Sequence, residues 1–266
     1  MGTITGDFAG ETVIVTGGSS GIGRAVALAF GDAGATVINA DVRREPKDLD
    51  ADQPTHEAIR DHGGKAKYVE TDVSDPAELE SVIAAAQKKG GVDVMINNAG
   101  VHLSRRFCDV SPADFEQVHG VNARGTFFGT QAAAEDMIAR DDPGVIVNTA
   151  STTATRPEFE HSHYGATKGA IRMITRSAAL ELAGEGVRVN SVAPGPIATE
   201  ITEGWSERAT ESIGSNGNED EDAPVMTPTR AGQPVDLAGA YLYLASEQAD
   251  YVTGEELRVN GGARLS

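Results

Sequence analysis

Hydrophobic and polar positions divide the chain into two kinds of segment, short apolar runs and longer stretches with helical spacing. The first run, 11–16, is β-branched and precedes a glycine-rich turn and a helical pattern from Arg24 to Phe30. Short apolar runs bounded by turn residues predict strands, and apolar positions every three to four residues predict helices. Further strands are predicted at 35–41, 66–75, 92–100, 144–151, 187–196 and 254–262, and further helices at 54–62, 76–89, twice within 111–140, 162–183 and 236–246.

Strands and helices alternate along the chain, without an internal repeat or a second domain. This order predicts an α/β fold: a single doubly wound Rossmann-type domain over residues 1–266, with about seven mainly parallel strands and helices on both faces. Residues 200–226 differ because they are polar, acidic and poor in apolar residues. We expect them to form a lid over the functional site.

The composition excludes several classes of protein. Hydrophobic residues make up 39% of the 266, which is enough for a layered core and too many for a disordered chain. The single cysteine, Cys108, excludes an internal disulfide and a cysteine-rich metal site, and we predict no bound metal. No apolar run reaches the length of a membrane span and the first residues lack a signal-peptide pattern, so we expect a soluble cytoplasmic protein without membrane partners.

The charge balance is strongly acidic. Asp and Glu number 40 against 22 Lys and Arg, which gives a formal net charge of −18. Nucleic-acid binding is therefore not expected, because phosphate contacts need a basic face. An acidic chain with 16 arginines and only 6 lysines indicates a halophilic protein that stays soluble in high salt, and an ordinary acidic enzyme is the alternative.

The glycine-rich turn after the first strand has the spacing T-G-x-x-x-G-x-G, from Thr16 to Gly23. Such glycines allow a tight turn and bring the backbone close to a pyrophosphate at the positive end of a helix. The second strand ends in Asp41, whose carboxylate would bind adenosine ribose hydroxyls and repel a 2′-phosphate. The sequence thus predicts NAD as the cofactor, although Arg43 and Arg44 leave NADP open.

Three residues suit proton transfer. Ser151 ends a predicted strand, and Tyr164 and Lys168 lie four residues apart, about one helical turn. A lysine cation one turn away would lower the tyrosine pKa from its usual value of about 10. A serine hydroxyl can hold the oxygen of an alcohol or a carbonyl, so the three together suit chemistry at a carbinol oxygen. Asn122 stands in the middle of a predicted helix, where asparagine is unfavourable without a reason.

Taken together and in order, these motifs resemble the short-chain dehydrogenase/reductase family over almost the whole chain. The resemblance rests on TGGSSGIG (16–23), Asp72-Val73, NNAG (97–100), Asn122, Ser151, YGATK (164–168) and Pro194-Gly195. One departure is Ala150, where the family often has a second serine before the catalytic one.

The resemblance implies a catalytic tetrad. Tyr164 would be the acid/base and Ser151 would position the substrate oxygen. Lys168 would lower the Tyr164 pKa and hold the nicotinamide ribose. Asn122 would kink its helix and hold a water that connects Lys168 to solvent. The family is commonly tetrameric, which predicts a homotetramer or a dimer.

The resemblance also implies a cofactor site. Ile197 and Thr199 match positions that contact the nicotinamide carboxamide, and Asp72 would border the adenine, cap the helix from Pro76, or do both. Ser20 stands where NADP-preferring members often carry a basic residue. The predicted cofactor residues are Gly17, Ser19, Ser20, Gly21, Ile22, Gly23, Asp41, Val42, Asp72, Val73, Asn98, Ala99, Gly100, Tyr164, Lys168, Pro194, Gly195, Ile197 and Thr199.

The function that these observations favour is an NAD-dependent oxidoreductase acting on a secondary alcohol or sugar hydroxyl, or on the matching ketone. One alternative is a 3-oxoacyl thioester reductase, which Asp41 disfavours because reductive biosynthesis usually draws on NADP. Another is a non-catalytic dinucleotide-binding regulator, which the intact tetrad disfavours. The polar lid and the loop 152–163 favour a hydroxylated substrate over a long acyl chain. The sequence does not decide which of six candidate residues contact the substrate. They are His102, Thr153, Glu158, His161, His163 and Trp205.

Overall fold

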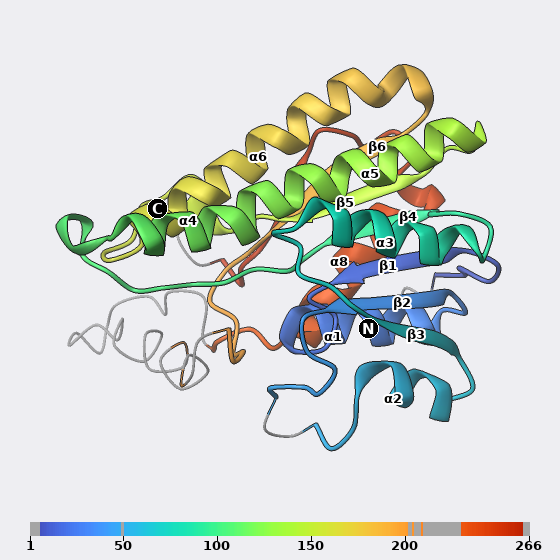
Figure 1. Ribbon diagram of the computed structural model, residues 1–266, viewed down its shortest axis with the longest axis horizontal. Helices are drawn as coiled ribbons and strands as arrows, with labels where there is room; N and C mark the ends of the chain where they lie inside the picture. The colour runs from blue at the N-terminus through green and yellow to red at the C-terminus, as the bar shows by residue number, and fades with distance from the viewer. Residues whose placement is uncertain (1–5, 49–50, 202–203, 205–208, 210–229, 263–266) are drawn as a thin grey trace, which may run out of the picture.

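A parallel sheet is the framework of the molecule (Figure 1). Its strands are β1 (Thr12–Thr16), β2 (Thr36–Asp41), β3 (Lys65–Glu70), β4 (Val94–Asn97), β5 (Val145–Thr149), β6 (Arg188–Pro194) and β7 (Glu256–Val259). The structure is a computed structural model that describes residues 6–48, 51–201, 204, 209 and 230–262. In these residues the seven strands have the order β3-β2-β1-β4-β5-β6-β7, and every neighbouring pair is parallel.

Helices follow the strands along the chain. The α-helices are α1 (Gly21–Asp32), α2 (Thr55–Asp61), α3 (Pro76–Gln87), α4 (Pro112–His119), α5 (Gly125–Arg140), α6 (Ser162–Leu182) and α8 (Val235–Ala245). Short 3-10 turns lie at Phe107–Asp109, Thr152–Ala154, Ala183–Glu185 and Glu247–Ala249. The strand order runs outward from β1 to β3 and then from β4 to β7, so the predicted doubly wound α/β fold is confirmed and the switch point lies between β1 and β4.

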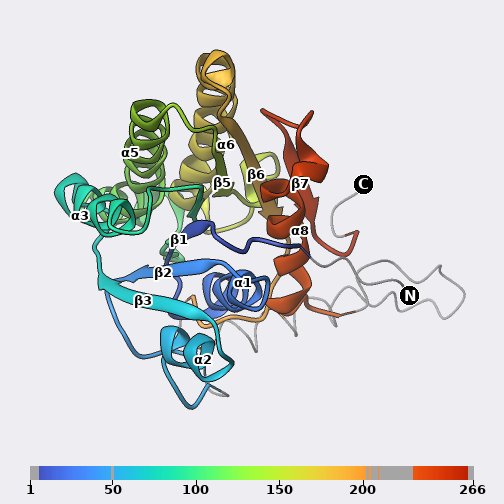
Figure 2. The same ribbon diagram turned by 90° about the vertical axis from the view of Figure 1, so that its right-hand side faces the viewer.

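Both faces of the sheet are covered. Figure 2 shows α3, α5 and α6 on one face and α1 with α8 on the other. Successive strand residues point to opposite faces, so Val13 and Val15 pack in the core under α1 and α8 while Ile14 packs under α3 and α5. Coverage of both faces explains why β1 reads as a continuous apolar run and not as an alternating one.

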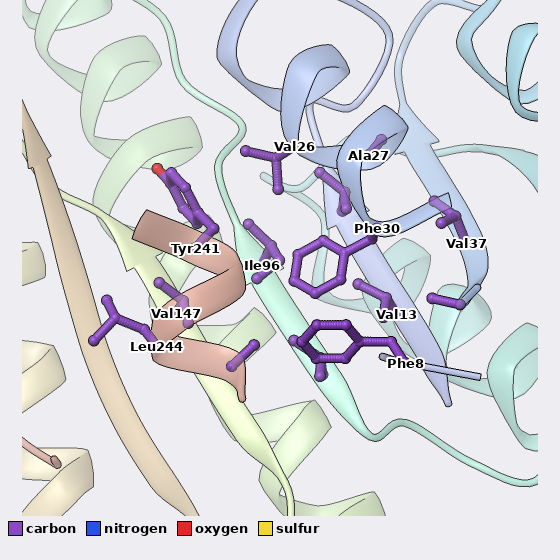
Figure 3. Packing of buried hydrophobic residues seen from close by; sticks show 14 of the residues in the cluster. Phe8, Val13, Val26, Ala27, Phe30, Val37, Ile96, Val147, Tyr241 and Leu244 are labelled. Carbon is purple, nitrogen blue, oxygen red and sulfur yellow. The ribbon is translucent and has the colours of Figure 1, made fainter. Parts of the chain in front are cut away.

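The core between the sheet and α1 is built around aromatic side chains (Figure 3). Phe8 packs edge-on against Phe30 with the ring centroids 4.9 Å apart. Burying each such side chain contributes about 1.5–3 kcal/mol to the free energy of unfolding. Tyr241 of α8 is fully buried there, and its hydroxyl lies 2.7 Å from Thr149 Oγ1 at the end of β5. The core therefore reaches the edge of the sheet where the strands end.

The predicted helical region 111–140 contains a π-helical turn, Gly120–Arg124, between α4 and α5. A capping box of Ser111 and Asp114 begins α4. Asn122 lies within the turn, and the kink that it is expected to make in its helix stays a prediction. Such turns insert one extra residue into a helix and recur at functional sites.

Several element ends differ from the prediction. The segment 66–75, predicted to be a strand with a turn, contributes to a strand that begins at Lys65 and ends at Glu70. The strand expected at 92–100 comprises only Val94–Asn97, because the chain leaves the sheet after Asn97. The helix that follows β3 is capped by Asp75, whose side chain accepts from Ala77 N, so the alternative that Asp72 caps it is wrong.

Apart from 200, 201, 204 and 209, the predicted lid 200–226 lies outside the described residues, as does Trp205.

Candidate functional site

The carboxyl ends of the strands border a cavity of about 690 Å³. In doubly wound sheets, ligands bind at this edge and at the switch point between the two halves. The residues that line it at or just after the ends of successive strands are Gly17, Asp41, Thr71, Asp72, Asn98, Ala99, Gly100, Ala150, Ser151, Pro194 and Gly195. The cavity therefore has the position and size of a binding site for a small molecule.

The glycine turn closes tightly under the amino end of α1. Gly17 has a φ of +63°, in the left-handed region that glycine tolerates. A Cβ atom on Gly23 would lie 2.1 Å from the carbonyl oxygen of Gly17, so the helix can approach the turn only with glycine there. This close packing presents the first backbone N–H groups of α1 to the cavity, where they suit an anion.

A carboxylate already lies at the amino end of α1. The Gly21 N–H is shared between both carboxylate oxygens of Asp48, at N–O distances of 2.8 and 2.9 Å. The neighbouring Lys47 N–H donates to Ser20 Oγ over 2.7 Å. Negative charge is stabilised at this end of a helix, so the position of the Asp48 carboxylate suits an anionic group.

Nothing in the sequence predicted this contact. Asp48 lies 27 residues from Gly21 in the chain, and no local pattern connects them. Lys47 was missed in the same way, although it lines the cavity.

Asp41 lies at the end of β2 with its carboxylate held by the backbone. Its oxygens accept from Ser19 N at 3.0 Å and from Arg43 N at 3.1 Å. Arg43 lines the cavity, whereas Arg44 forms an ion pair with Glu57 and is not part of the lining. Of the two arginines that left NADP open in the sequence, only Arg43 borders the cavity.

Ser151, Tyr164 and Lys168 come together in the cavity from two elements, the end of β5 and the first turns of α6. Lys168 Nζ donates to the carbonyl oxygen of Thr149 over 2.8 Å and lies 5.6 Å from the centroid of the Tyr164 ring. Ser151 Oγ accepts from Thr153 Oγ1 at 2.9 Å and from Thr153 N at 3.2 Å. The Ser151 hydroxyl therefore has its own proton left to donate.

The protonation of this group is governed by burial. Burial raises the pKa of the Tyr164 phenol; a hydrogen bond with Ser151 lowers it, and the charge of Glu158 raises it. The pKa of Tyr164 is therefore raised overall, whereas the sequence predicted from Lys168 that it would be lowered. Burial disfavours the phenolate more strongly than the hydrogen bond with Ser151 favours it. Burial also lowers the pKa of Lys168, to about 8.

Asn122 lies beneath this group and does not line the cavity. Its Oδ1 accepts from Val101 N at 2.8 Å, and its Nδ2 donates to Val101 O at 3.0 Å and to Thr167 Oγ1 at 3.2 Å. The side chain thus links the segment after β4 to α6. The water that Asn122 is expected to hold stays a prediction.

Polar side chains gather at the end of the cavity beside Tyr164. The His102 ring centroid lies 4.9 Å from that of Tyr164 and 4.5 Å from that of His161. His161 Nε2 lies 4.0 Å from Glu158 Oε2. These side chains and Thr153 line the cavity, whereas His163 is buried outside the lining. Four of the candidates for substrate contact that the sequence left open therefore face the same space.

Nearly all of the predicted cofactor residues border this one cavity. Ser19 and Gly23 are the exceptions, because both are buried within the glycine-rich turn itself. In the part of the chain that the structure describes, no three His, Cys, Asp or Glu side chains are grouped so that they could hold a metal ion. No helix there is long and apolar enough to cross a membrane.

Comparisons with known proteins agree with this geometry. A family model described as Enoyl-(Acyl carrier protein) reductase matches residues 17–264. Glucose 1-dehydrogenase 2 of Bacillus subtilis (strain 168) is 36% identical over 261 residues, covering 97% of this chain and 96% of that protein. Meso-2,3-butanediol dehydrogenase of Serratia marcescens is 33% identical over 261 residues, covering 97% of this chain and 96% of that protein.

Solved structures are similar over the same length. A short-chain type dehydrogenase/reductase from Mycobacterium marinum superposes with a TM-score of 0.87 at 33% identity, covering 98% of both chains. A structure from Agrobacterium tumefaciens with bound NADP, assigned provisionally as a 2-deoxy-d-gluconate 3-dehydrogenase, gives a TM-score of 0.81 at 31% identity, with 96% of this chain and 97% of that chain covered.

Proposed function

Because the chain belongs to the short-chain dehydrogenase/reductase family, we propose that it transfers a hydride between NAD and a secondary alcohol or sugar hydroxyl, or the matching ketone. One observation carries the proposal: Ser151, Tyr164 and Lys168 line the same cavity as Asp41. One end of this cavity suits proton transfer at a carbinol oxygen, and the other suits the hydroxyls of an adenosine ribose.

The residues at the adenosine end fit a dinucleotide. The glycine turn leaves room where a Cβ atom would intrude, and the contact of the Asp48 carboxylate with Gly21 N supports anion binding at the amino end of α1. Asp41 would accept from ribose hydroxyls and repel a 2′-phosphate, which supports NAD over NADP. The bound NADP of the Agrobacterium relative belongs to that protein, and Arg43 is the residue here that could meet such a phosphate.

The residues of the chain divide the proton chemistry between them. When bound, the nicotinamide supplies the hydride acceptor. In oxidation Tyr164 Oη takes the proton from the carbinol oxygen, and in reduction it returns that proton. Ser151 Oγ, fixed by Thr153, donates to the substrate oxygen and holds it in place. Lys168 stabilises the phenolate that forms, because its cation lies near the Tyr164 ring.

A second candidate is reduction of a 3-oxoacyl thioester. It has support from a 3-oxoacyl-acyl-carrier-protein reductase of Thermotoga maritima, which is 34% identical over 254 residues, with 95% of this chain and 97% of that protein covered. The Asp41 carboxylate opposes it, since NADP would bring a phosphate against that charge. Oxidation of NADPH by an acetoacetyl thioester, faster than NADH formation with any alcohol, would favour this candidate.

Other expectations accompany the proposal. We expect a cytoplasmic homotetramer or dimer that is most active in high salt, with residues 200–226 as a lid over the cavity. Size-exclusion chromatography across a range of salt concentrations would test both the assembly and the halophilic character.

The experiment that tests the function is NADH formation with a panel of secondary alcohols and sugars in high salt. Turnover of at least one of them supports a dehydrogenase. A protein that binds NADH yet turns over nothing in the panel, in either direction, supports a non-catalytic regulator instead.

A further inference from the structure

Glu158 brings a carboxylate to the reacting end of the cavity. It lies in the segment between β5 and α6 and lines the cavity together with Ser151 and Tyr164. Its side chain is 23% exposed, and its negative charge acts on the Tyr164 phenol. A carboxylate so close to the reacting group bears on the charge of any substrate that Tyr164 can serve.

The cations of this cavity lie elsewhere. Within the described part of the lining they are Arg43, Lys47 and Lys168. Arg43 and Lys47 lie at the adenosine end beside Asp41 and the amino end of α1. Lys168 directs its ammonium group to the Thr149 carbonyl. Within the described part of the lining, a substrate carboxylate at the reacting end would therefore face Glu158 without a dedicated cation, which is unfavourable in a partly buried site.

The same surroundings suit hydroxyl groups. A carboxylate accepts hydrogen bonds from hydroxyls, and such charge-assisted bonds are stronger than neutral ones. His161 Nε2 lies 4.0 Å from Glu158 Oε2, and the His102 ring packs beside the His161 ring. Two imidazoles that can donate or accept hydrogen bonds therefore border the same space as Glu158. Hydroxyls flanking the reacting carbinol would find acceptors and donors here.

We infer that Glu158 is a specificity-determining residue, which accepts a hydrogen bond from a hydroxyl adjacent to the reacting carbinol and thereby selects neutral vicinal diols and polyols over hydroxy acids. The inference rests on the proposed dehydrogenase function and names its substrate class. In the reaction, the carbinol carbon loses a hydride to the nicotinamide and the carbinol oxygen loses its proton to Tyr164. The neighbouring hydroxyl that Glu158 holds is unchanged.

A structural role for Glu158 would look different. If the carboxylate served only to hold His161, its loss would slow every substrate alike. Loss of the Glu158 charge would also change the pKa of Tyr164. That change would affect every substrate alike, because Tyr164 exchanges the proton with all of them. The ratio of kcat/KM values for a neutral substrate and its acid cancels such common effects and reports on selection alone.

The experiment compares matched pairs in which a CH₂OH group is replaced by a carboxylate: propane-1,2-diol with lactate, and glucitol with gluconate. It is run at alkaline pH, where imidazoles are neutral. Wild type should favour the neutral member by at least about a hundredfold in kcat/KM. Glu158→Gln should reduce this preference by about a hundredfold, through slower diol oxidation and faster acid oxidation.

Glu160→Gln is the matched control. Glu160 lies two residues along the same segment, pairs with Arg106 at 3.9 Å and is not part of the lining. Its substitution should leave the preference within about twofold of wild type. A Glu158→Gln enzyme that binds NADH and keeps the wild-type preference overturns this inference alone. A wild type that prefers the acids also overturns it, and one that oxidises no member of either pair and no other alcohol overturns the proposed function as well.

Discussion

Lys168 donates a hydrogen bond from Nζ to the carbonyl oxygen of Thr149 at a distance of 2.8 Å. The contact joins the second turn of α6 to the last residue of β5, two residues before Ser151. Lys168 is buried, and burial lowers its pKa to about 8, while the carbonyl accepts a hydrogen bond from its ammonium group. The edge of the sheet thus fixes where the cation stands relative to the Tyr164 ring.

The first prediction concerns pH. Burial raises the Tyr164 pKa, so the phenol is the favoured form near neutral pH. Oxidation needs the phenolate as a base, and its kcat/KM should therefore rise from about pH 6 to about pH 8, where the Lys168 cation that stabilises the phenolate begins to lose its proton. Reduction needs the phenol as an acid and should not rise over this range. An oxidation rate that is independent of pH throughout would contradict the assignment of Tyr164 as the base.

The second prediction concerns the choice of cofactor. Replacing Asp41 by serine removes the carboxylate that would repel a 2′-phosphate and leaves Arg43 at the cavity. Asp41→Ser should lower kcat/KM with NAD by about tenfold and raise kcat/KM with NADP by a similar factor. The ratio of the two kcat/KM values measures the change in preference. The control is Asp72→Ser, which changes a carboxylate farther along the same edge. An unchanged ratio in Asp41→Ser would mean that another residue sets the preference.

The third prediction concerns the carboxylate at the amino end of α1. A dinucleotide pyrophosphate must displace Asp48 from Gly21 N, so the native contact competes with the cofactor. Asp48→Ala removes the competitor and should lower the Kd for NADH by about tenfold, equivalent to about 1.4 kcal/mol.

Asp52→Ala serves as the control because Asp52 is an exposed acid farther along the same segment. It removes the same charge from the surface and should change the Kd by less than about twofold. Isothermal titration calorimetry on both variants would decide. Weaker binding in Asp48→Ala would show instead that Asp48 helps to hold the cofactor.

The fourth prediction separates structure from chemistry at Asn122. Its amide holds the backbone N–H and C=O of Val101. Asn122→Ala should lower the free energy of unfolding by about 3 kcal/mol, because these buried groups lose their partner. Activity should fall in parallel, since the segment after β4 lines the cavity. Urea unfolding gives the first quantity. Full stability combined with lost activity would assign Asn122 a role in proton transfer alone.

The sequence predicted the fold well because its signals are local. Strand–turn–helix alternation, the spacing from Thr16 to Gly23 and the four residues between Tyr164 and Lys168 are all readable within one element and its neighbours. The confirmed doubly wound sheet then brings the strand ends to one edge, which accounts for most of the cavity lining.

What the sequence could not predict depends on tertiary structure. The contact of Asp48 with Gly21 connects residues on different elements, and only the path of the loop creates it. The direction of the Tyr164 pKa shift depends on how completely neighbouring segments exclude water, which no residue spacing encodes. Which of the candidate polar residues border the cavity, Glu158 among them, likewise depends on how the loops fold around it.

The measurement that tests the central claim most directly is NADH formation by wild type and by Tyr164→Phe, paired with NADH binding by both. The substitution removes only the hydroxyl that exchanges the proton. Turnover of the best alcohol in the panel should fall by about a thousandfold while the Kd for NADH stays within about twofold. Turnover of Tyr164→Phe close to that of wild type would contradict the claim that Tyr164 is the acid/base of this site.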